Sequence, residues 1–272
     1  MVGIYLVISA GLTLFLNNFF DILREPYSWW LVPLMVVCLT LCFILLHFLA
    51  VILMISATRL DKPPKGTGFF RFLIKTGLPT VLKLAGINVE TVGTEKLPEQ
   101  GRILLLCNHQ HDFDPVIIFN TFPDAHLSFI GKKDICDEMP FIARAMHLLE
   151  CLFIDRENDR EAAKTIVNAI KHLKEERGSI ALFPEGYCSA DDELLPFRNG
   201  SLKVAIKTKA PVVVCVINNT KKIIPNMFRK TTVVDFRILD VIRPEEYENM
   251  NTAELGDIIH NKMKVALDDI RK

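Results

Sequence analysis

The first 58 residues of this 272-residue chain contain almost no charge, since Asp21, Arg24 and Glu25 are their only charged side chains. A segment with so little charge does not form the solvated surface of a globular domain. Its apolar runs, residues 2–20 and 29–57, are separated by a short polar stretch. About 20 apolar residues suffice to cross the hydrocarbon core of a bilayer. We therefore predict a membrane helical hairpin in residues 1–58.

No basic residue precedes the first apolar run and no small-residue cleavage motif follows it, which argues against a cleaved signal peptide. Basic residues follow the second run instead, and the positive-inside rule then places the rest of the chain in the cytoplasm. Residues 59–86 contain these basic residues together with Phe and Leu side chains, a pattern typical of a basic interfacial segment lying on anionic lipid. The first helix of the globular core is the alternative interpretation, and Pro79 is expected to interrupt any continuous helix there.

The seven cysteines contain no C-x-x-C pair, which argues against a zinc or disulfide framework and is typical of a reducing compartment. The formal charge is balanced, with 32 basic and 32 acidic residues, and gives no indication of nucleic-acid binding. A catalytic thiolate at Cys107 or Cys188 stays possible because both adjoin polar motifs, although no neighbouring residue specifies one.

Short apolar runs ended by polar or turn residues are typical of buried parallel strands. Such runs occupy residues 102–107, 126–131, 151–154, 179–183 and 211–217, with a later one at 233–239. Apolar residues at helical spacing predict an amphipathic crossover helix over 158–176. Further helices are predicted over 115–119, 140–149, 202–208 and 252–271. This alternation predicts an α/β domain in residues 87–272, with a mostly parallel central sheet flanked by helices.

Three polar motifs follow predicted strands: CNHQHDFDP at 107–115, FIDR at 153–156 and FPEG at 183–186. Sites in open α/β sheets collect at the carboxyl ends of parallel strands, so we expect these motifs to meet at one edge.

The pair His109 and Asp114 suits general-base catalysis. A histidine accepts a proton near neutral pH, and a carboxylate on its other nitrogen stabilises the imidazolium. No Ser or Thr in the motif offers a nucleophile, which favours direct transfer to a substrate hydroxyl over an acyl-enzyme. Asp114 before Pro115 also has the pattern of a helix N-cap, so a purely structural role is the alternative.

A metal site is a further alternative, because His109, His111, Asp112 and Asp114 are dense potential ligands and would indicate a metal-dependent membrane hydrolase. A di-metal hydrolase motif of the His-x-His-x-Asp-His type would need Asp at position 113 and His at position 114. The chain has Phe113 and Asp114 there. We therefore rate metal binding below the dyad and predict no metal ligand.

The run Asn108-His109-QHDF-Asp114 resembles the Asn-His-x-x-x-x-Asp motif of the 1-acylglycerol-3-phosphate acyltransferase family. GKKD, FIDR, FPEG and FRNG follow in the family's order, so that the resemblance covers residues from about 88 to 217. It implies that His109 is the general base, that Asp114 is its orienting partner, and that no metal or organic cofactor is expected. It also implies transfer of a fatty-acyl group from acyl-CoA or acyl-carrier protein to the hydroxyl of lysophosphatidic acid, giving phosphatidic acid.

The resemblance further implies which residues bind the phosphate and glycerol of the acyl acceptor: Asn108, Lys132, Arg156, Glu185, Gly186 and Arg198. Three residues depart from the family pattern. Glu150 replaces a glycine, Val214 replaces a proline, and Cys188 replaces the arginine of EGTRS. Another lysophospholipid or an aminoacyl lipid therefore stays open as the acyl acceptor, and a non-catalytic lipid-binding protein is a third alternative. The expected location is the cell membrane, with the catalytic domain on the cytoplasmic face.

Overall fold

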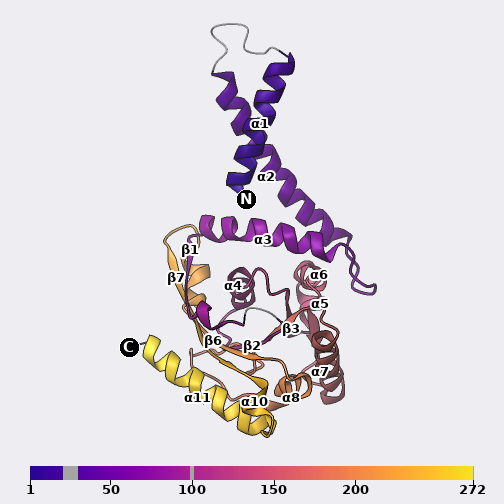
Figure 1. Ribbon diagram of the computed structural model, residues 1–272, viewed down its shortest axis with the longest axis vertical. Helices are drawn as coiled ribbons and strands as arrows, with labels where there is room; N and C mark the ends of the chain where they lie inside the picture. Colours follow the sequence, from indigo (N-terminus) through magenta and orange to yellow (C-terminus); the bar gives the residue numbers. More distant parts are fainter. Residues whose placement is uncertain (21–29, 99–100, 272) are drawn as a thin grey trace.

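The computed structural model describes residues 1–20, 30–98 and 101–271, and a seven-stranded sheet forms the centre of its globular part (Figure 1). The strand order is β1-β7-β6-β2-β5-β3-β4. The strands are β1 (Ile87–Val92), β2 (Leu104–Cys107), β3 (Leu127–Lys132), β4 (Leu152–Ile154), β5 (Ser179–Leu182), β6 (Val212–Asn218) and β7 (Thr232–Ile242).

Five neighbouring strands, from β6 to β4, are parallel, which confirms the predicted α/β class. β7 runs antiparallel to β6, and β1 pairs in parallel with β7. All the predicted strands form, whereas β1 was not predicted. Its sequence INVETV alternates buried and exposed residues because this strand lies at the sheet edge, so it lacks the continuous apolar run of a strand covered on both faces.

Helices cover both faces of the sheet, with α3, α4 and α6 on one side and α7, α8 and α11 on the other (Figure 1). Strand β2 shows how one strand serves both layers: Leu105 and Cys107 belong to one buried cluster, and Leu104 and Leu106 to the other. Successive side chains of a strand point to opposite faces, which explains its unbroken apolar sequence. The longer helices are α1 (Val2–Phe20), α2 (Leu31–Ala57), α3 (Thr67–Leu84), α4 (Asp114–Thr121), α6 (Pro140–Leu148), α7 (Asp159–Lys174) and α11 (Thr252–Ile270).

Shorter helical segments connect these elements. They are η1 (Thr94–Lys96), α5 (Ile135–Glu138), η2 (Asn199–Leu202), α8 (Lys203–Thr208), η3 (Thr220–Lys222), α9 (Ile223–Asn226) and α10 (Pro244–Tyr247).

Helices α1 and α2 project from the sheet domain as a packed pair (Figure 1). α2 has 27 residues, and among the described residues it is the helix long and apolar enough to cross a membrane. The polar link predicted between the two helices lies mostly outside the described residues. His47 of α2 joins three helices, because its Nδ1 lies 2.8 Å from the Tyr5 hydroxyl and its Nε2 lies 3.1 Å from the Leu73 carbonyl oxygen. Gly77 permits this approach, since a Cβ there would lie 2.7 Å from Nε2 of His47.

Helix α3 is continuous through Pro79, so the predicted interruption is wrong. A proline inside a helix removes one backbone hydrogen bond, and packing on the sheet domain compensates for this loss. Phe70 and Leu73 are buried, whereas Phe69 and Phe72 are each 56% exposed. One face of α3 therefore belongs to the core, as one interpretation had it, and the opposite face presents aromatic side chains outward.

Arg71 fastens α3 to the sheet domain. Its guanidinium is buried and donates hydrogen bonds to the Leu127 carbonyl (2.8 Å), the Ser128 hydroxyl (3.2 Å) and the Leu149 carbonyl. The Glu150 carboxylate lies 3.9 Å away, and its negative charge offsets the buried positive charge of Arg71. The single side chain thus joins α3, the start of β3 and the end of α6.

Replacing Arg71 by Ala should lower the free energy of unfolding by about 3 kcal/mol, because two carbonyl groups and one hydroxyl lose a charged donor. In a domain of this size that corresponds to a fall in Tm of roughly 6–12 °C, measured by thermal unfolding in detergent. The exposed Arg59, which pairs with Asp61, provides the control, and Arg59→Ala should leave Tm unchanged. Equal Tm values for both variants would contradict this role.

Candidate active site

The polar motifs that follow β2 and β5 meet at one edge of the sheet, because these two strands are neighbours and parallel. His109 lies in the loop after β2 and Asp114 at the start of the following helix α4, and the loop after β5 holds Glu185 and Cys188. The backbone amide of Ser189 donates to the His109 carbonyl oxygen at 2.8 Å, so the two loops are joined directly. The convergence expected from the sequence is thus present at this edge for CNHQHDFDP and FPEG.

The His109 and Asp114 side chains are hydrogen-bonded, with 2.8 Å between Nδ1 and Oδ2. Asp114 Oδ2 also accepts from the backbone amides of Gln110 (2.6 Å) and His111 (2.9 Å). The Asp114 carboxylate is fully buried, and 12% of the His109 side chain is exposed. Asp114 thus closes a tight turn around the loop and fixes the imidazole orientation at the same time.

The alternative role of Asp114 as a helix N-cap is not present. Asp114 is the first residue of α4, and its carboxylate turns back to the preceding loop and does not cap the helix. Phe113 stands at the N-cap position without a side-chain hydrogen bond. The carboxylate is therefore committed to His109 and to the loop that carries it.

The environment of His109 favours its protonated form. Burial opposes the charge, but the hydrogen bond and negative charge of Asp114, together with Cys188, outweigh it and raise the pKa of His109 to about 9. Stabilising the imidazolium in this way lowers the cost of accepting a proton at Nε2. The ring also stacks on Phe183, with 4.0 Å between centroids and 13° between planes.

Glu185 holds the His109 loop from the other side. Its two carboxylate oxygens accept from the backbone amides of His109 (2.6 Å) and Leu195 (2.7 Å). Burial raises the pKa of Glu185 to about 7, although both backbone hydrogen bonds act in the opposite direction. Because both oxygens are engaged inside the protein, we assign Glu185 a positioning role in place of the predicted substrate contact.

Asn108 has a comparable role at the end of β2. Its side-chain amide donates to the Ile217 carbonyl oxygen (3.0 Å), and its side-chain oxygen accepts from the Ile217 backbone amide (2.8 Å). These two bonds tie the residue before His109 to β6. Asn108 is buried, so it too is assigned a positioning role and not the predicted contact with substrate.

Three of the predicted binding residues, Arg156, Gly186 and Arg198, line a cavity of about 530 Å³ beside the site. Aliphatic side chains of α7 and β5 form much of its wall, and Lys203 and Lys207 add positive charge. Phe183 also lines the cavity and its ring stacks on His109, so the cavity borders the dyad.

Tyr187 orders the two arginines of this cavity. The Arg156 and Arg198 guanidinium carbons lie 5.1 Å and 4.8 Å from its ring centroid, and Arg198 donates to its hydroxyl at 2.9 Å. Gly186 lets Arg198 approach closely, because it has φ of 80° and a Cβ there would lie 2.9 Å from Arg198 Cδ. Lys132 is not among the cavity-lining residues, and it forms an ion pair with Asp134 at the end of β3.

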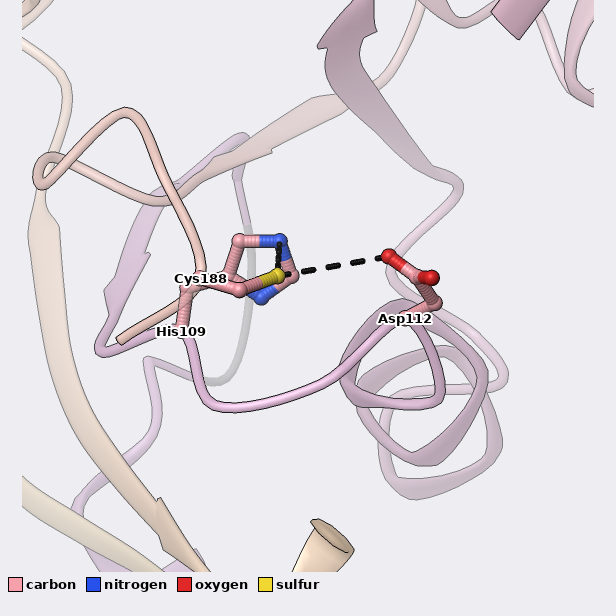
Figure 2. Close-up of side chains that lie close together, drawn as sticks. All are labelled: His109, Asp112 and Cys188. Atoms are coloured by element: carbon pink, nitrogen blue, oxygen red, sulfur yellow. Dashed lines mark hydrogen bonds between the residues drawn. The ribbon is translucent and has the colours of Figure 1, made fainter. Parts of the chain in front are cut away.

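The metal cluster weighed as an alternative for residues 109–114 does not assemble from those residues alone. Asp114 is bonded to His109 Nδ1, and the His111 ring accepts from the Phe113 backbone amide at 3.2 Å. Among the described residues, the group with metal-binding geometry consists of His109, Asp112 and Cys188. Figure 2 shows the Cys188 sulfur beside the imidazole, with the Asp112 carboxylate facing it.

Comparison with known proteins agrees with these motifs. A family model described as Acyltransferase matches residues 88–218. The 1-acyl-sn-glycerol-3-phosphate acyltransferase of Borreliella burgdorferi is 30% identical over 195 residues, covering 70% of this chain and 76% of that protein. The enzyme of the same name from Salmonella typhimurium is 32% identical over 174 residues, covering 64% of this chain and 70% of that protein.

The chain belongs to the 1-acyl-sn-glycerol-3-phosphate acyltransferase family. The crystal structure of the 1-acyl-sn-glycerophosphate acyltransferase PlsC from Thermotoga maritima has the same fold, with a TM-score of 0.64 at 20% identity. The match covers 100% of this chain and 98% of that one. The family resemblance and the fold class expected from the sequence are thereby confirmed.

Two departures from the family motifs have a visible structural setting. Glu150, where the family has glycine, adopts a left-handed conformation with φ of 57°, and its carboxylate pairs with Arg177 at 2.8 Å. Cys188, where the family has arginine, lies 3.1 Å from Nε2 of His109. Burial raises the pKa of the Cys107 thiol well above its usual value, which disfavours a thiolate there. Of the two cysteines considered from the sequence, it is Cys188 that contacts His109.

Sequence analysis did not identify Phe183 and Tyr187 as site residues, and it gave Cys188 no partner. All three lie in or beside the FPEG motif. Phe183 and Cys188 contact His109, which lies more than 70 residues earlier, and no local sequence pattern indicates such a distant contact. Only the pairing of β2 with β5 brings them together.

Replacing Asn108 by Ala should destabilise the fold by about 2–3 kcal/mol, because the Ile217 amide and carbonyl lose their partners in a buried position. We expect activity to fall together with the Tm, since the backbone of His109 loses its link to β6. Asn168 is exposed on α7, and Asn168→Ala should change neither quantity. An unchanged Tm in Asn108→Ala would show that the side chain serves another purpose.

Proposed function

We propose that this protein transfers a fatty-acyl group from acyl-CoA or acyl-carrier protein to the free hydroxyl of 1-acylglycerol-3-phosphate, giving phosphatidic acid. The observation that carries the proposal is the bond between Asp114 Oδ2 and His109 Nδ1, which leaves Nε2 as the atom that accepts a proton. The names of the relatives from Borreliella burgdorferi and Salmonella typhimurium support the same reaction and acyl acceptor.

In the proposed reaction the acceptor hydroxyl gives its proton to His109 Nε2 while its oxygen attacks the thioester carbonyl carbon. Asp114 stabilises the imidazolium that forms. The tetrahedral intermediate then collapses, the carbon–sulfur bond breaks, and the departing thiolate takes the proton from Nε2. The Cys188 thiol lies next to Nε2 and is exposed, so the hydroxyl displaces it by rotation of the Cys188 side chain.

The cavity lined by Arg156 and Arg198 is the proposed site for the acyl acceptor. Guanidinium groups bind phosphate through paired hydrogen bonds, and the aliphatic wall suits the acyl chain that the acceptor already carries. Lys132 lies outside this lining and is proposed to act at long range through its charge.

We propose an integral protein of the cell membrane with its catalytic domain, residues 87–272, on the cytoplasmic face. Residues 1–58 form the membrane hairpin, and residues 59–86 lie at the interface. The length of α2, the exposed Phe69 and Phe72 of α3, and the basic residues after α2 support this arrangement. The lipid bilayer is then a partner of the enzyme, and no nucleic acid is expected to bind.

Altering either member of the dyad should slow the reaction strongly. We expect His109→Ala and Asp114→Asn to reduce kcat by about 10²- to 10⁴-fold, the range that general-base catalysis contributes. The assay is transfer of a labelled acyl chain from its thioester to lysophosphatidic acid, with the product identified by mass.

The matched control is His111→Ala, because this second histidine of the motif makes no bond to Asp114 through its ring. It should retain most of the activity. Full activity in His109→Ala, with a circular dichroism spectrum like that of the wild type, would refute the proposal.

Arg198 tests the choice of acyl acceptor. Arg198→Gln should raise KM for lysophosphatidic acid by about 10- to 100-fold, the value of one or two charge-assisted hydrogen bonds, and leave KM for the acyl donor unchanged. Arg229 is exposed and is not among the cavity-lining residues, so Arg229→Gln should change neither KM. A larger effect of Arg198→Gln on the donor would place the thioester in this cavity instead.

A further inference from the structure

Three potential metal ligands converge on the open side of the catalytic histidine. Cys188 Sγ lies 3.1 Å from His109 Nε2 and 4.0 Å from Asp112 Oδ1. One donor atom from each of the three residues falls within 4.8 Å of the others. The thiol is thus the middle member of the group, as Figure 2 shows.

These separations suit a tetrahedral cation. Zinc binds Cys sulfur at about 2.3 Å and His nitrogen or carboxylate oxygen at about 2.0–2.2 Å, which places neighbouring donors roughly 3.4–3.6 Å apart. The sulfur–nitrogen distance is a little shorter than this and the sulfur–oxygen distance a little longer. Cys188 and Asp112 are both exposed, so shifts of roughly half an ångström by their side chains would complete the geometry.

The orientation of His109 is an independent observation that favours metal binding. Metal-ligating histidines almost always donate their other ring N–H to a carboxylate or carbonyl, which fixes the ring and raises its basicity. Asp114 occupies that position here, at 2.8 Å from Nδ1, and is itself held by two backbone amides. Nε2 therefore faces Cys188 before any ligand arrives.

The donor set selects the class of cation. A thiolate with an imidazole and one carboxylate suits Zn²⁺, Co²⁺ or Cd²⁺, whereas Mg²⁺ and Ca²⁺ prefer an all-oxygen shell. Three protein ligands leave the fourth position of a tetrahedral ion to water. An arginine at position 188, as in EGTRS, would repel a cation, so the site depends on the cysteine of this chain.

We propose that His109, Asp112 and Cys188 form an inhibitory binding site for Zn²⁺ and similar divalent cations. Binding releases the protons carried by Cys188 Sγ and His109 Nε2, and the metal then occupies the Nε2 lone pair. The imidazole can no longer accept a proton from the acyl acceptor. Inhibition rests on the proposed function of His109, whereas binding of the metal does not.

The test uses the full-length protein in detergent, freed of metal and titrated with Co²⁺ and Zn²⁺. The wild type should bind one equivalent, show the thiolate-to-cobalt charge-transfer band, and lose acyltransferase activity with the same midpoint. Chelation should restore the activity. Mg²⁺ should neither bind nor inhibit at the same concentrations.

Two variants remove ligands without touching the dyad. Both Cys188→Ser and Asp112→Asn should weaken Co²⁺ and Zn²⁺ binding by at least about 10- to 100-fold, the loss that even an indirect partner of a metal causes, and Asp112→Asn should keep basal activity. Cys136→Ser is the matched control, because Cys136 is a partly exposed thiol outside the cluster, and it should bind and respond like the wild type.

A wild type without the charge-transfer band, or Cys188→Ser that binds as tightly as the wild type, would overturn the metal site. Zinc inhibition of Asp112→Asn at the wild-type midpoint would overturn it as well, since the carboxylate would then not be a ligand. One equivalent of bound zinc with undiminished activity would overturn the inhibitory role and also contradict His109 as the base. A protein that binds zinc as expected but transfers no acyl group would contradict the proposed function alone.

Discussion

The hydrogen bond between Asp114 and His109 is the interaction on which the rest of the site depends. A buried carboxylate is costly unless it is paired, and here one oxygen accepts three N–H groups, one from the imidazole and two from the loop backbone. Loop conformation and ring orientation are therefore determined together. The loop is also held from both neighbouring strands, by Asn108 toward β6 and by Glu185 from the end of β5. Such positioning by buried groups keeps one reactive nitrogen in place.

The same geometry accounts for two properties of His109 that appear unrelated. An imidazole with a carboxylate on Nδ1 is both a strengthened base and a strengthened metal ligand, because each property depends on the electron pair at Nε2. With the family's arginine at position 188, His109 would act only as a base. With Cys188 and Asp112 beside Nε2, the His109 of this chain can also act as a metal ligand.

Much of the fold could be predicted because β2, β3, β5 and β6 are covered on both sides and so have continuous apolar sequences. The edge strand β1 alternates and was missed, and the reversed direction of β7 has no signal in its residues. At the site, the His109 and Asp114 pair was predicted from local sequence, as was the set Arg156, Gly186 and Arg198 that lines one cavity. Whether Asn108 and Glu185 bond to backbone or to substrate depends on strands far away in sequence, and Cys188 reaches His109 only through the pairing of β5 with β2.

The most direct measurement of the central claim is the protonation of the two His109 ring nitrogens by ¹⁵N NMR, with the resonances assigned by their loss in His109→Gln. The account predicts that Nδ1 keeps its proton, in a strong hydrogen bond, in both the charged and the neutral ring, while Nε2 alone gains and loses a proton. Asp114→Asn should abolish the strongly hydrogen-bonded Nδ1 proton. A neutral ring that carries its proton on Nε2 in the wild type would contradict the account, because the nitrogen facing the acyl acceptor could not then act as the base.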